Sequence, residues 1–132
     1  MSGFYTNIEK DVKENLFFRK VIFTGNNSQL VLMTLKPNEE IGMEVHNEND
    51  QFFRFEEGNG KVIIGTEEFT VGPDDVVIVP SGEIHNVINT SEDKYLKMYT
   101  IYSPAHHKDG VVHKTKAEAE TDDEEFDGMA TE

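Results

Sequence analysis

The chain has 132 residues, which suits one domain with a modest hydrophobic core. It carries 26 acidic and 12 basic side chains, for a net charge of −14, which argues against nucleic acid and against anionic membranes as partners. Cysteine is absent, which excludes disulfides and thiolate metal sites, and no segment reaches the ~20 consecutive apolar residues of a membrane span.

Short strands separated by turns are predicted for most of the chain. Residues 1–16 are polar, and the Thr6-x-x-Glu9 spacing is that of a helix cap. From residue 17 onward, segments rich in Val, Ile, Phe, Thr and Tyr alternate with Gly, Pro, Asn and Asp. The predicted strands are 17–24, 29–36, 41–46, 50–57, 60–65, 67–71, 75–80, 84–89 and 94–102. Many short strands at regular spacing, with few helical signals, indicate an all-β sandwich or barrel.

The composition changes after residue 103. Residues 104–110 are predicted to form a loop, and residues 114–120 a helical turn. Residues 117–132 contain eight acidic side chains and no Lys or Arg, and the last dozen residues are predicted to form a solvated tail without fixed structure. The chain is thus divided into an N-terminal segment (1–16), a barrel (17–104) and a C-terminal part (105–132). Because the N-terminus has no apolar run typical of a signal peptide, we expect a cytoplasmic protein.

The segment 80–89 contains the most specific pattern, P-x-G-x2-H-x3-N, formed by Pro80, Gly82, His85 and Asn89. The proline and glycine predict a tight turn, and the strand that follows carries the histidine near its start. An imidazole at a strand entrance has a ring nitrogen available for a metal ion. A lone histidine in a strand is better explained as a structural residue, so the interpretation of His85 depends on a second polar cluster.

That second cluster lies upstream, with the spacing Glu44-x-His46-x4-Gln51-x6-Gly58. Because strand side chains alternate between the two faces, Glu44 and His46 share one face. If Gln51 points inward, every second residue of 50–57 does so too, and two of these are phenylalanines. The result is an apolar interior beside a polar cluster, which is the character of small-molecule pockets.

The two patterns together resemble the two motifs of the cupin family, G-x5-H-x-H-x3-4-E-x6-G and G-x5-P-x-G-x2-H-x3-N. His46 and Gly58 match residues of the first motif. The positions that depart from the two motifs are Asn38, Glu44, Gln51 and Asp74. The resemblance spans roughly residues 29–102, and the chain as a whole resembles small single-domain bacterial cupins that are often described as mannose-6-phosphate isomerase-like.

The resemblance implies an all-β fold, the double-stranded β-helix or jelly-roll barrel, with a divalent metal ion inside it. The implied ligands are Glu44, His46, Gln51 and His85, with Glu44 in place of a histidine and Gln51 in place of the glutamate. The ligand set keeps one negative charge, but its donors change from three nitrogens and one oxygen to two of each. Oxygen-richer sites suit Mn²⁺ or Fe²⁺, and Ni²⁺ and Zn²⁺ are the other candidates.

The implied function is that of a metal-dependent cupin acting on an oxygen-rich small molecule, such as a sugar derivative or a hydroxy acid, with the metal as Lewis acid. Isomerases, lyases and dioxygenases share this scaffold, so the reaction and the catalytic residues stay open. One alternative is a cupin that binds metal or carbohydrate without catalysis. Another is a barrel that has lost its metal, because two of the four ligand positions are substituted.

Several polar residues also have a simpler interpretation. Glu44 is also explained by a solvent-facing strand position, and Gln51 by hydrogen bonding to a ligand rather than to the metal. Glu48 is a rival carboxylate nearby. The histidines of the C-terminal part form either a second metal site or, as we prefer, exposed loop residues with one of them closing over the barrel mouth. They are His106, His107 and His113.

A homodimer is predicted from the aromatic residues of 50–57. Phe53 and Phe55 point inward if Gln51 does, whereas Phe52 points outward. A single barrel wall buries only one of its faces, so the outward aromatic face needs a cover. The N-terminal segment, with Phe4 and Tyr5, or a second copy of the chain in a two-fold dimer would provide it.

Overall fold

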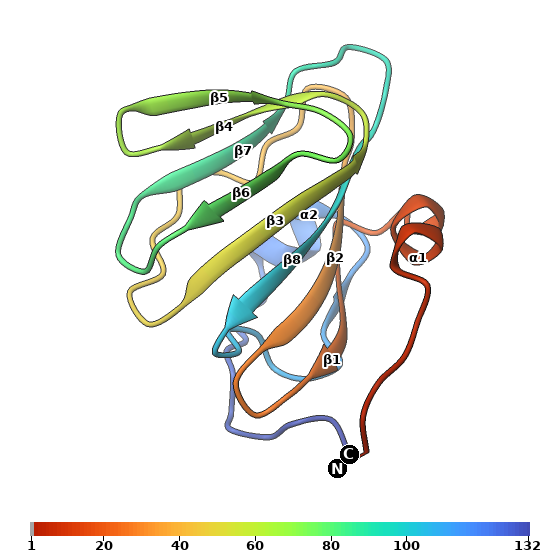
Figure 1. The fold of residues 1–132 in the computed structure, drawn as a ribbon, viewed down its shortest axis with the longest axis vertical. Helices are drawn as coiled ribbons and strands as arrows, with labels where there is room; N and C mark the ends of the chain where they lie inside the picture. The colour runs from red at the N-terminus through yellow and green to blue at the C-terminus, as the bar shows by residue number, and fades with distance from the viewer. Residues whose placement is uncertain (1) are drawn as a thin grey trace.

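The structure is a computed structural model that describes residues 2–132, and it contains two antiparallel β-sheets that face each other (Figure 1). One sheet has the strand order β6-β3-β8-β2-β1-β9 and the other β5-β4-β7. The strands are β1 (Arg19–Thr24), β2 (Gln29–Leu35), β3 (Asp50–Glu57), β4 (Gly60–Ile64), β5 (Glu67–Val71), β6 (Val76–Val79), β7 (His85–Asn89), β8 (Leu96–Ser103) and β9 (Val112–His113). This architecture confirms the predicted all-β double-stranded β-helix, a jelly-roll barrel.

The hydrophobic core lies between the two sheets and is built by residues that alternate along the strands. On β3, Gln51, Phe53 and Phe55 are 2%, 0% and 0% exposed, which confirms the predicted inward face. On β7, Val87 and Asn89 are buried with His85. The predicted alternation ends near Glu56, which is buried although its parity points outward, because a register shift between Phe55 and Glu57 interrupts the pairing with β8.

The segment 41–46 is not a strand, contrary to the prediction. It is extended chain with isolated bridges at its edges, Glu40 to Ile88 and Glu44 to His85. Gly42 has φ 106°, a left-handed conformation that interrupts a ladder, and its N–H donates to the side chain of Asn86 at 2.8 Å. The chain therefore follows β7 through single hydrogen bonds, including the Ile41 N–H to the Val87 carbonyl at 2.9 Å, and not through a regular ladder.

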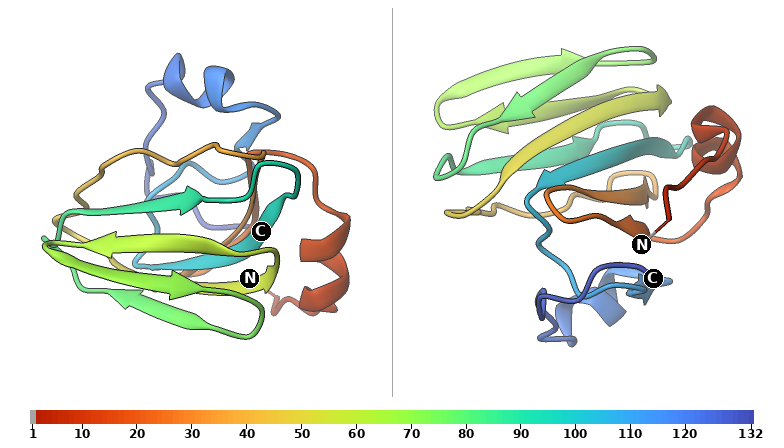
Figure 2. Two further views of the ribbon diagram at one scale, coloured as in Figure 1. Left: turned by 90° about the horizontal axis from the view of Figure 1, so that it is seen from above. Right: turned by 60° about the horizontal axis from the view of Figure 1, so that its bottom comes forward.

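The N-terminal segment contains a short helix, α1 (Ile8–Glu14), that packs on the sheet beside β2, β3 and β8 (Figure 2). Its N-cap is Asn7, whose side chain accepts a hydrogen bond from the Lys10 N–H at 3.0 Å. The helix predicted here thus exists, although the cap lies one residue after Thr6. Val12 of this helix is fully buried against the sheet, so α1 covers part of the outer face of the barrel wall.

The C-terminal part folds back along the barrel; most of residues 121–132 stay exposed, as their charge predicted, but hydrogen bonds hold the segment in place. After α2 (Lys116–Glu120), the Phe126 N–H donates to the His106 carbonyl at 3.0 Å, and the Thr131 N–H donates to the Thr24 carbonyl at 2.9 Å. Glu124 binds His107 and the Lys108 N–H, so its charge has partners within the barrel wall. These contacts also bring the two ends of the chain close together (Figures 1 and 2). Ser2 and residues 128–132 line one surface cavity there. No helix within residues 2–132 has the length and apolar character needed to cross a membrane.

We propose that the chain dimerises through the outer face of β3 and β6, which α1 leaves open. Ile78 and Val76 are 60% and 46% exposed, and Ile78 pairs with the half-buried Phe52. Ile78→Glu is expected to convert a dimer of twice 15.0 kDa into a monomer, measured by light scattering at micromolar concentration. Leu16→Glu is the control, because Leu16 is similarly exposed (62%) but belongs to the N-terminal segment. A wild-type monomer would contradict the dimer, and dissociation by Leu16→Glu alone would place the interface elsewhere.

Candidate metal centre

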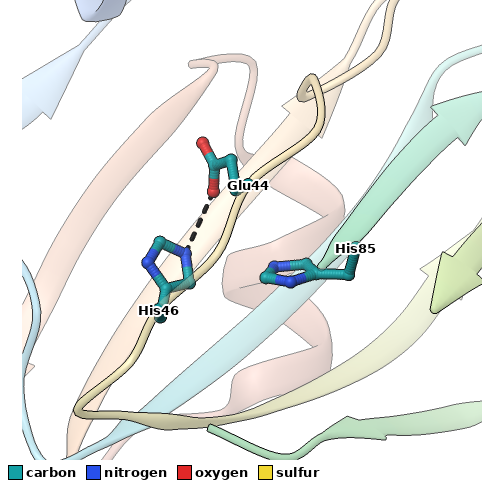
Figure 3. A group of neighbouring side chains, drawn as sticks. All are labelled: Glu44, His46 and His85. Atoms are coloured by element: carbon teal, nitrogen blue, oxygen red, sulfur yellow. Dashed lines mark hydrogen bonds and ion pairs between the residues drawn. The ribbon is translucent and has the colours of Figure 1, made fainter. Parts of the chain in front are cut away.

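Three side chains meet at the mouth of the barrel: Glu44 and His46 from the extended segment before β3, and His85 from the start of β7 (Figure 3). Reciprocal backbone hydrogen bonds of 2.8 and 2.9 Å between Glu44 and His85 hold the two segments together. The turn predicted at 80–82 adds a third link, because the Gly82 N–H donates to the His46 carbonyl at 2.9 Å. The backbone thereby fixes the spacing of the three side chains.

The ligand atoms of Glu44, His46 and His85 lie within 4.8 Å of one another. The Glu44 Oε2 is 3.0 Å from the His46 Nε2, and the Gln51 Oε1 is 3.1 Å from the His85 Nε2. Atoms that share one metal at about 2.1 Å are at most about 4.2 Å apart, so a small side-chain adjustment would bring this cluster to that spacing. Glu48 is exposed and lies outside the cluster, so the rival carboxylate does not join it.

Two of the departures from the cupin motifs are explained by backbone conformation. Asn38 and Asp74 stand where those motifs have glycine, and their φ angles are 62° and 72°. Asparagine and aspartate are the residues other than glycine that best tolerate this left-handed region. Gly58 keeps its glycine because a Cβ there would lie 2.2 Å from the Tyr95 carbonyl oxygen. The substitutions at positions 38 and 74 therefore leave the barrel path unchanged.

The charge state of the cluster follows from its burial. His85 is 3% exposed, and burial lowers its pKa, so the ring is neutral near pH 7 and offers a lone pair. Burial also works against ionisation of Glu44, but its hydrogen bond to and electrostatic interaction with His46 outweigh it and hold the pKa of Glu44 below its usual value. The cluster thus combines an anionic oxygen with imidazole nitrogens, the donor set that divalent transition metals bind.

The surroundings of His85 indicate that a cation belongs there. A neutral imidazole has one N–H, yet both ring nitrogens face oxygens: Nδ1 is 3.1 Å from the Glu83 carbonyl and Nε2 is 3.1 Å from the Gln51 Oε1. Gln51 has its amide nitrogen directed at the Thr100 hydroxyl at 3.0 Å, which leaves its oxygen facing His85. In one of these two nitrogen–oxygen contacts, therefore, a nitrogen lone pair faces an oxygen lone pair with no proton between them. A metal ion bound to Nε2 and Oε1 would satisfy both atoms, so these residues fit the group.

A second layer of side chains packs against the cluster, and of its members the sequence predicted only that one C-terminal histidine would reach the mouth. The His106 ring lies 4.2 Å from the His46 ring and stacks on Tyr102 at 5.2 Å. The Tyr102 hydroxyl is 3.2 Å from the His107 Nε2, and the His107 Nδ1 is 2.7 Å from the Glu124 Oε2. Burial raises the pKa of Tyr102 and lowers that of His107. This chain of contacts links the metal cluster to the C-terminal segment.

The three histidines of the C-terminal part differ from the expectation of exposed loop residues. His107 and His113 are 4% and 3% exposed, and each binds a carboxylate, Glu124 or Asp122. Only His106 reaches the barrel mouth, where we expected one of the three. Within residues 2–132 the cluster of Glu44, His46 and His85 is the one group of three metal-ligating side chains, so the alternative of a second metal site among these histidines finds no support.

A cavity of about 380 Å³ opens at the mouth beside His46 and His106. Residues 45–49 form one wall, and Glu125 and Phe126 from the C-terminal segment form another. Pockets of roughly 300–1,000 Å³ are the usual size for small-molecule ligands. The C-terminal segment therefore shapes the entrance to the site, which its composition alone did not predict.

The stability of the metal-free protein is expected to fall as the pH drops from 6.5 to 4. Burial, with help from His107 and His46, lowers the pKa of His106 to about 4, so the unfolded chain binds a proton in this window that the folded chain does not. The expected loss is about 1–2 kcal/mol, because solvent screens a partly exposed ring. Urea unfolding at both ends of the window measures it, and His106→Gln should flatten the slope. Equal slopes in the two proteins would contradict this assignment.

The comparisons with known proteins agree with this fold and site. The sequence profile of the cupin domain matches residues 31–102, more than half of the chain, and the chain belongs to the cupin family. YrkC of Bacillus subtilis (strain 168) is 43% identical over 122 residues, which cover 88% of this chain and 65% of that protein. L612 of Acanthamoeba polyphaga mimivirus is 39% identical over 112 residues, covering 83% and 70%. The chain thus spans slightly less than two thirds of the Bacillus subtilis relative.

A solved structure supports the same conclusion. The crystal structure of BH2720 from Bacillus halodurans superimposes with a TM-score of 0.89 at 40% sequence identity, over 92% of this chain and 96% of that one. The predicted membership of the family of small cupins is therefore confirmed. The narrower likeness to mannose-6-phosphate isomerase stays a prediction.

Proposed function

We propose that this cupin binds one divalent metal ion through Glu44, His46 and His85, with the Gln51 oxygen as fourth ligand, and uses the site to bind an oxygen-rich small molecule. The observation that carries the proposal is the cluster of ligand atoms within 4.8 Å of one another, beside which the His85 Nε2 and the Gln51 Oε1 lie 3.1 Å apart. Two nitrogens and two oxygens, one of them anionic, favour Mn²⁺ or Fe²⁺ over a purely nitrogen-preferring ion.

Two of the ligands, His85 and Gln51, are oriented by partners outside the cluster. The Glu83 carbonyl at 3.1 Å holds the Nδ1 side of His85, so that Nε2 faces the interior. The Thr100 hydroxyl holds the amide nitrogen of Gln51. Glu44 keeps its negative charge because His46 stabilises the carboxylate. When bound, the metal would supply Lewis-acid polarisation of a substrate oxygen.

The mouth cavity supports a small substrate. It begins at His46, its walls carry the polar groups of residues 47–49, and aromatic surface from His106 and Phe126 faces it. Rings and polar groups side by side suit a molecule with several oxygens on a short carbon skeleton. A sugar derivative and a hydroxy acid both have this character.

The test is metal content and stoichiometry. Protein purified without added metal, or stripped with a chelator and titrated calorimetrically with Mn²⁺ and Zn²⁺, is expected to bind one equivalent per chain. Substrate turnover by the metal-loaded protein then separates an enzyme from a cupin that binds without catalysis. Absence of any stoichiometric metal would overturn the proposal and leave a barrel that has lost its metal.

A further inference from the structure

Arg19 is a buried cation inside the barrel, although it begins the edge-side strand β1. Arg19 is 7% exposed, and Val21, two positions further along the same strand, is buried in the core. Its backbone pairs with Met33 of β2 on one side and with His113 of β9 on the other. Strands on both sides hold the start of β1, so the guanidinium is directed inward by a fixed backbone.

The guanidinium has few partners for a group so deeply buried. Its Nη1 donates to the His113 Nδ1 at 3.2 Å, and it lies 5.2 Å from the Phe18 ring centroid. Its Nε has no hydrogen-bond partner, and within residues 2–132 no carboxylate oxygen lies within 4.0 Å of it. His113 in turn binds Asp122 at 2.9 Å, so Arg19 reaches a carboxylate only through an imidazole, and its unpartnered Nε–H has donor capacity left for an anionic ligand.

The chain has one other arginine, whose Nε likewise makes no well-formed hydrogen bond but whose guanidinium has carboxylate partners. Arg54 on β3 is 3.0 Å from Glu56 and 2.9 Å from Asp74. Its charge is therefore balanced within the protein. The two arginines form a matched pair, one with carboxylate partners and one without.

Arg19 lines a cavity of about 150 Å³ that it shares with Glu44 of the metal cluster. Lys116 and Glu120 of α2 also line it and pair with each other at 3.9 Å, so Arg19 is the cation of this cavity without an ion-pair partner, and Phe18, Ile41 and Ala119 close the apolar side. Because one water takes about 30 Å³ of the liquid, the cavity holds roughly five water-sized groups. A fragment of a few heavy atoms can reach from Arg19 to Glu44 within this space.

We propose that Arg19 binds the carboxylate of the substrate, and that the substrate is a hydroxy acid rather than a neutral sugar derivative. A guanidinium presents parallel N–H groups that match the two oxygens of a carboxylate. The hydroxyl end of the same molecule would lie toward Glu44 and the metal ligands, so this inference rests on the proposed function and places the carboxylate end in this cavity, apart from the cavity beside His46 and His106. Glu44 does not compete for Arg19, because its carboxylate is directed to His46 at 3.0 Å.

The test uses the Nε–H signals of the two arginines in a ¹⁵N-correlated NMR spectrum of the Zn²⁺-loaded protein. L-Lactate and propane-1,2-diol are the probes, because they share a carbon skeleton and a hydroxyl and differ only in the carboxylate. Lactate is expected to shift the Arg19 signal saturably and leave the Arg54 signal in place, whereas the diol should shift neither. An unchanged Arg19 signal, or equal shifts of both arginines, would overturn the proposal.

Inorganic phosphate is the third probe, because a phosphate group would also satisfy a guanidinium. Tighter saturation by phosphate than by lactate would overturn the assignment to a carboxylate. Arg19→Lys is expected to weaken lactate binding about tenfold, since lysine keeps the charge but loses the paired N–H groups. Arg54→Lys is the matched control and should bind lactate as the wild type does; an equal loss in both variants would count against Arg19.

Failure of this inference is distinguishable from failure of the proposed function. If the protein binds metal but the Arg19 signal does not respond to lactate, the metal site stands and the carboxylate subsite is overturned. The metal-free protein is titrated in parallel, and a lactate response of Arg19 in a chain that takes up no metal would retain the carboxylate site alone. In that case the substrate orientation toward Glu44 would be overturned.

Discussion

His85→Ala is expected to lose its metal while the barrel stays folded. The imidazole provides one of the nitrogens of the cluster, and its removal leaves the Gln51 oxygen and the two remaining ligands without the shared centre. Loss of a residue that only hydrogen-bonds to a metal ligand typically costs about 10–100-fold in metal affinity, so loss of a ligand itself should cost more than about 100-fold. Calorimetric titration with Zn²⁺ measures this affinity, and circular dichroism monitors the β-structure.

His113→Ala is the control for this experiment. His113 is buried to the same degree as His85, 3% exposed in both cases, but it binds Arg19 and Asp122 and lies outside the metal cluster. This variant is expected to lose stability and keep its metal affinity. If His85→Ala instead lost its β-type circular dichroism before any change in metal binding, His85 would be a structural residue and not a ligand.

Phe53→Ala is expected to lower the free energy of unfolding by about 3–5 kcal/mol. Phe53 is fully buried, lies parallel to Phe55 with ring centroids 6.4 Å apart, and has its edge toward His85 at 6.3 Å. Truncation leaves a cavity that the two facing sheets cannot close, since β3 is paired on both sides. Urea unfolding with a linear extrapolation gives the free energy.

Phe52→Ala is the neighbouring control, because it removes the same side chain from the opposite face of β3. Phe52 is half-buried against Tyr99 with ring centroids 6.1 Å apart, so its loss is expected to cost about 1 kcal/mol. The difference between two adjacent phenylalanines tests the strand alternation directly. Equal losses would show that the outer face is as tightly packed as the core, as a strong dimer interface would require.

The part of the fold that follows from alternation could be predicted from sequence. Gln51 and Phe53 share the inward face of β3 because side chains alternate along a strand, and the apolar residues fix which face is buried. The position of His85 at a strand entrance follows in the same way from the proline and glycine before it. The sequence therefore placed the residues that the structure brings together at the barrel mouth.

The rest depends on contacts that local patterns do not contain. Residues 41–46 have strand composition, but Gly42 adopts a left-handed conformation and takes its hydrogen bond from the Asn86 side chain. The acidic composition of the tail does not predict that Glu124 binds His107, which lies 17 positions earlier in the chain. Arg19 looks like an exposed strand cation, and only the pairing of β1 with β9 shows that it is enclosed.

Because the two ends of the chain lie close together, the order of the strands in the sequence could be changed without changing the architecture of the barrel. Ser2 and residues 128–132 line the same cavity, so a short flexible linker would join them into a ring without displacing a strand. A ring has fewer conformations to lose on folding, which raises the stability of the folded form. New ends could then be opened at the turn 65–66 between β4 and β5, giving a circular permutant in which β5 comes first. The residues of the metal cluster would then lie ahead of and behind the new junction, assembled by the same sheet pairings in a different order of synthesis.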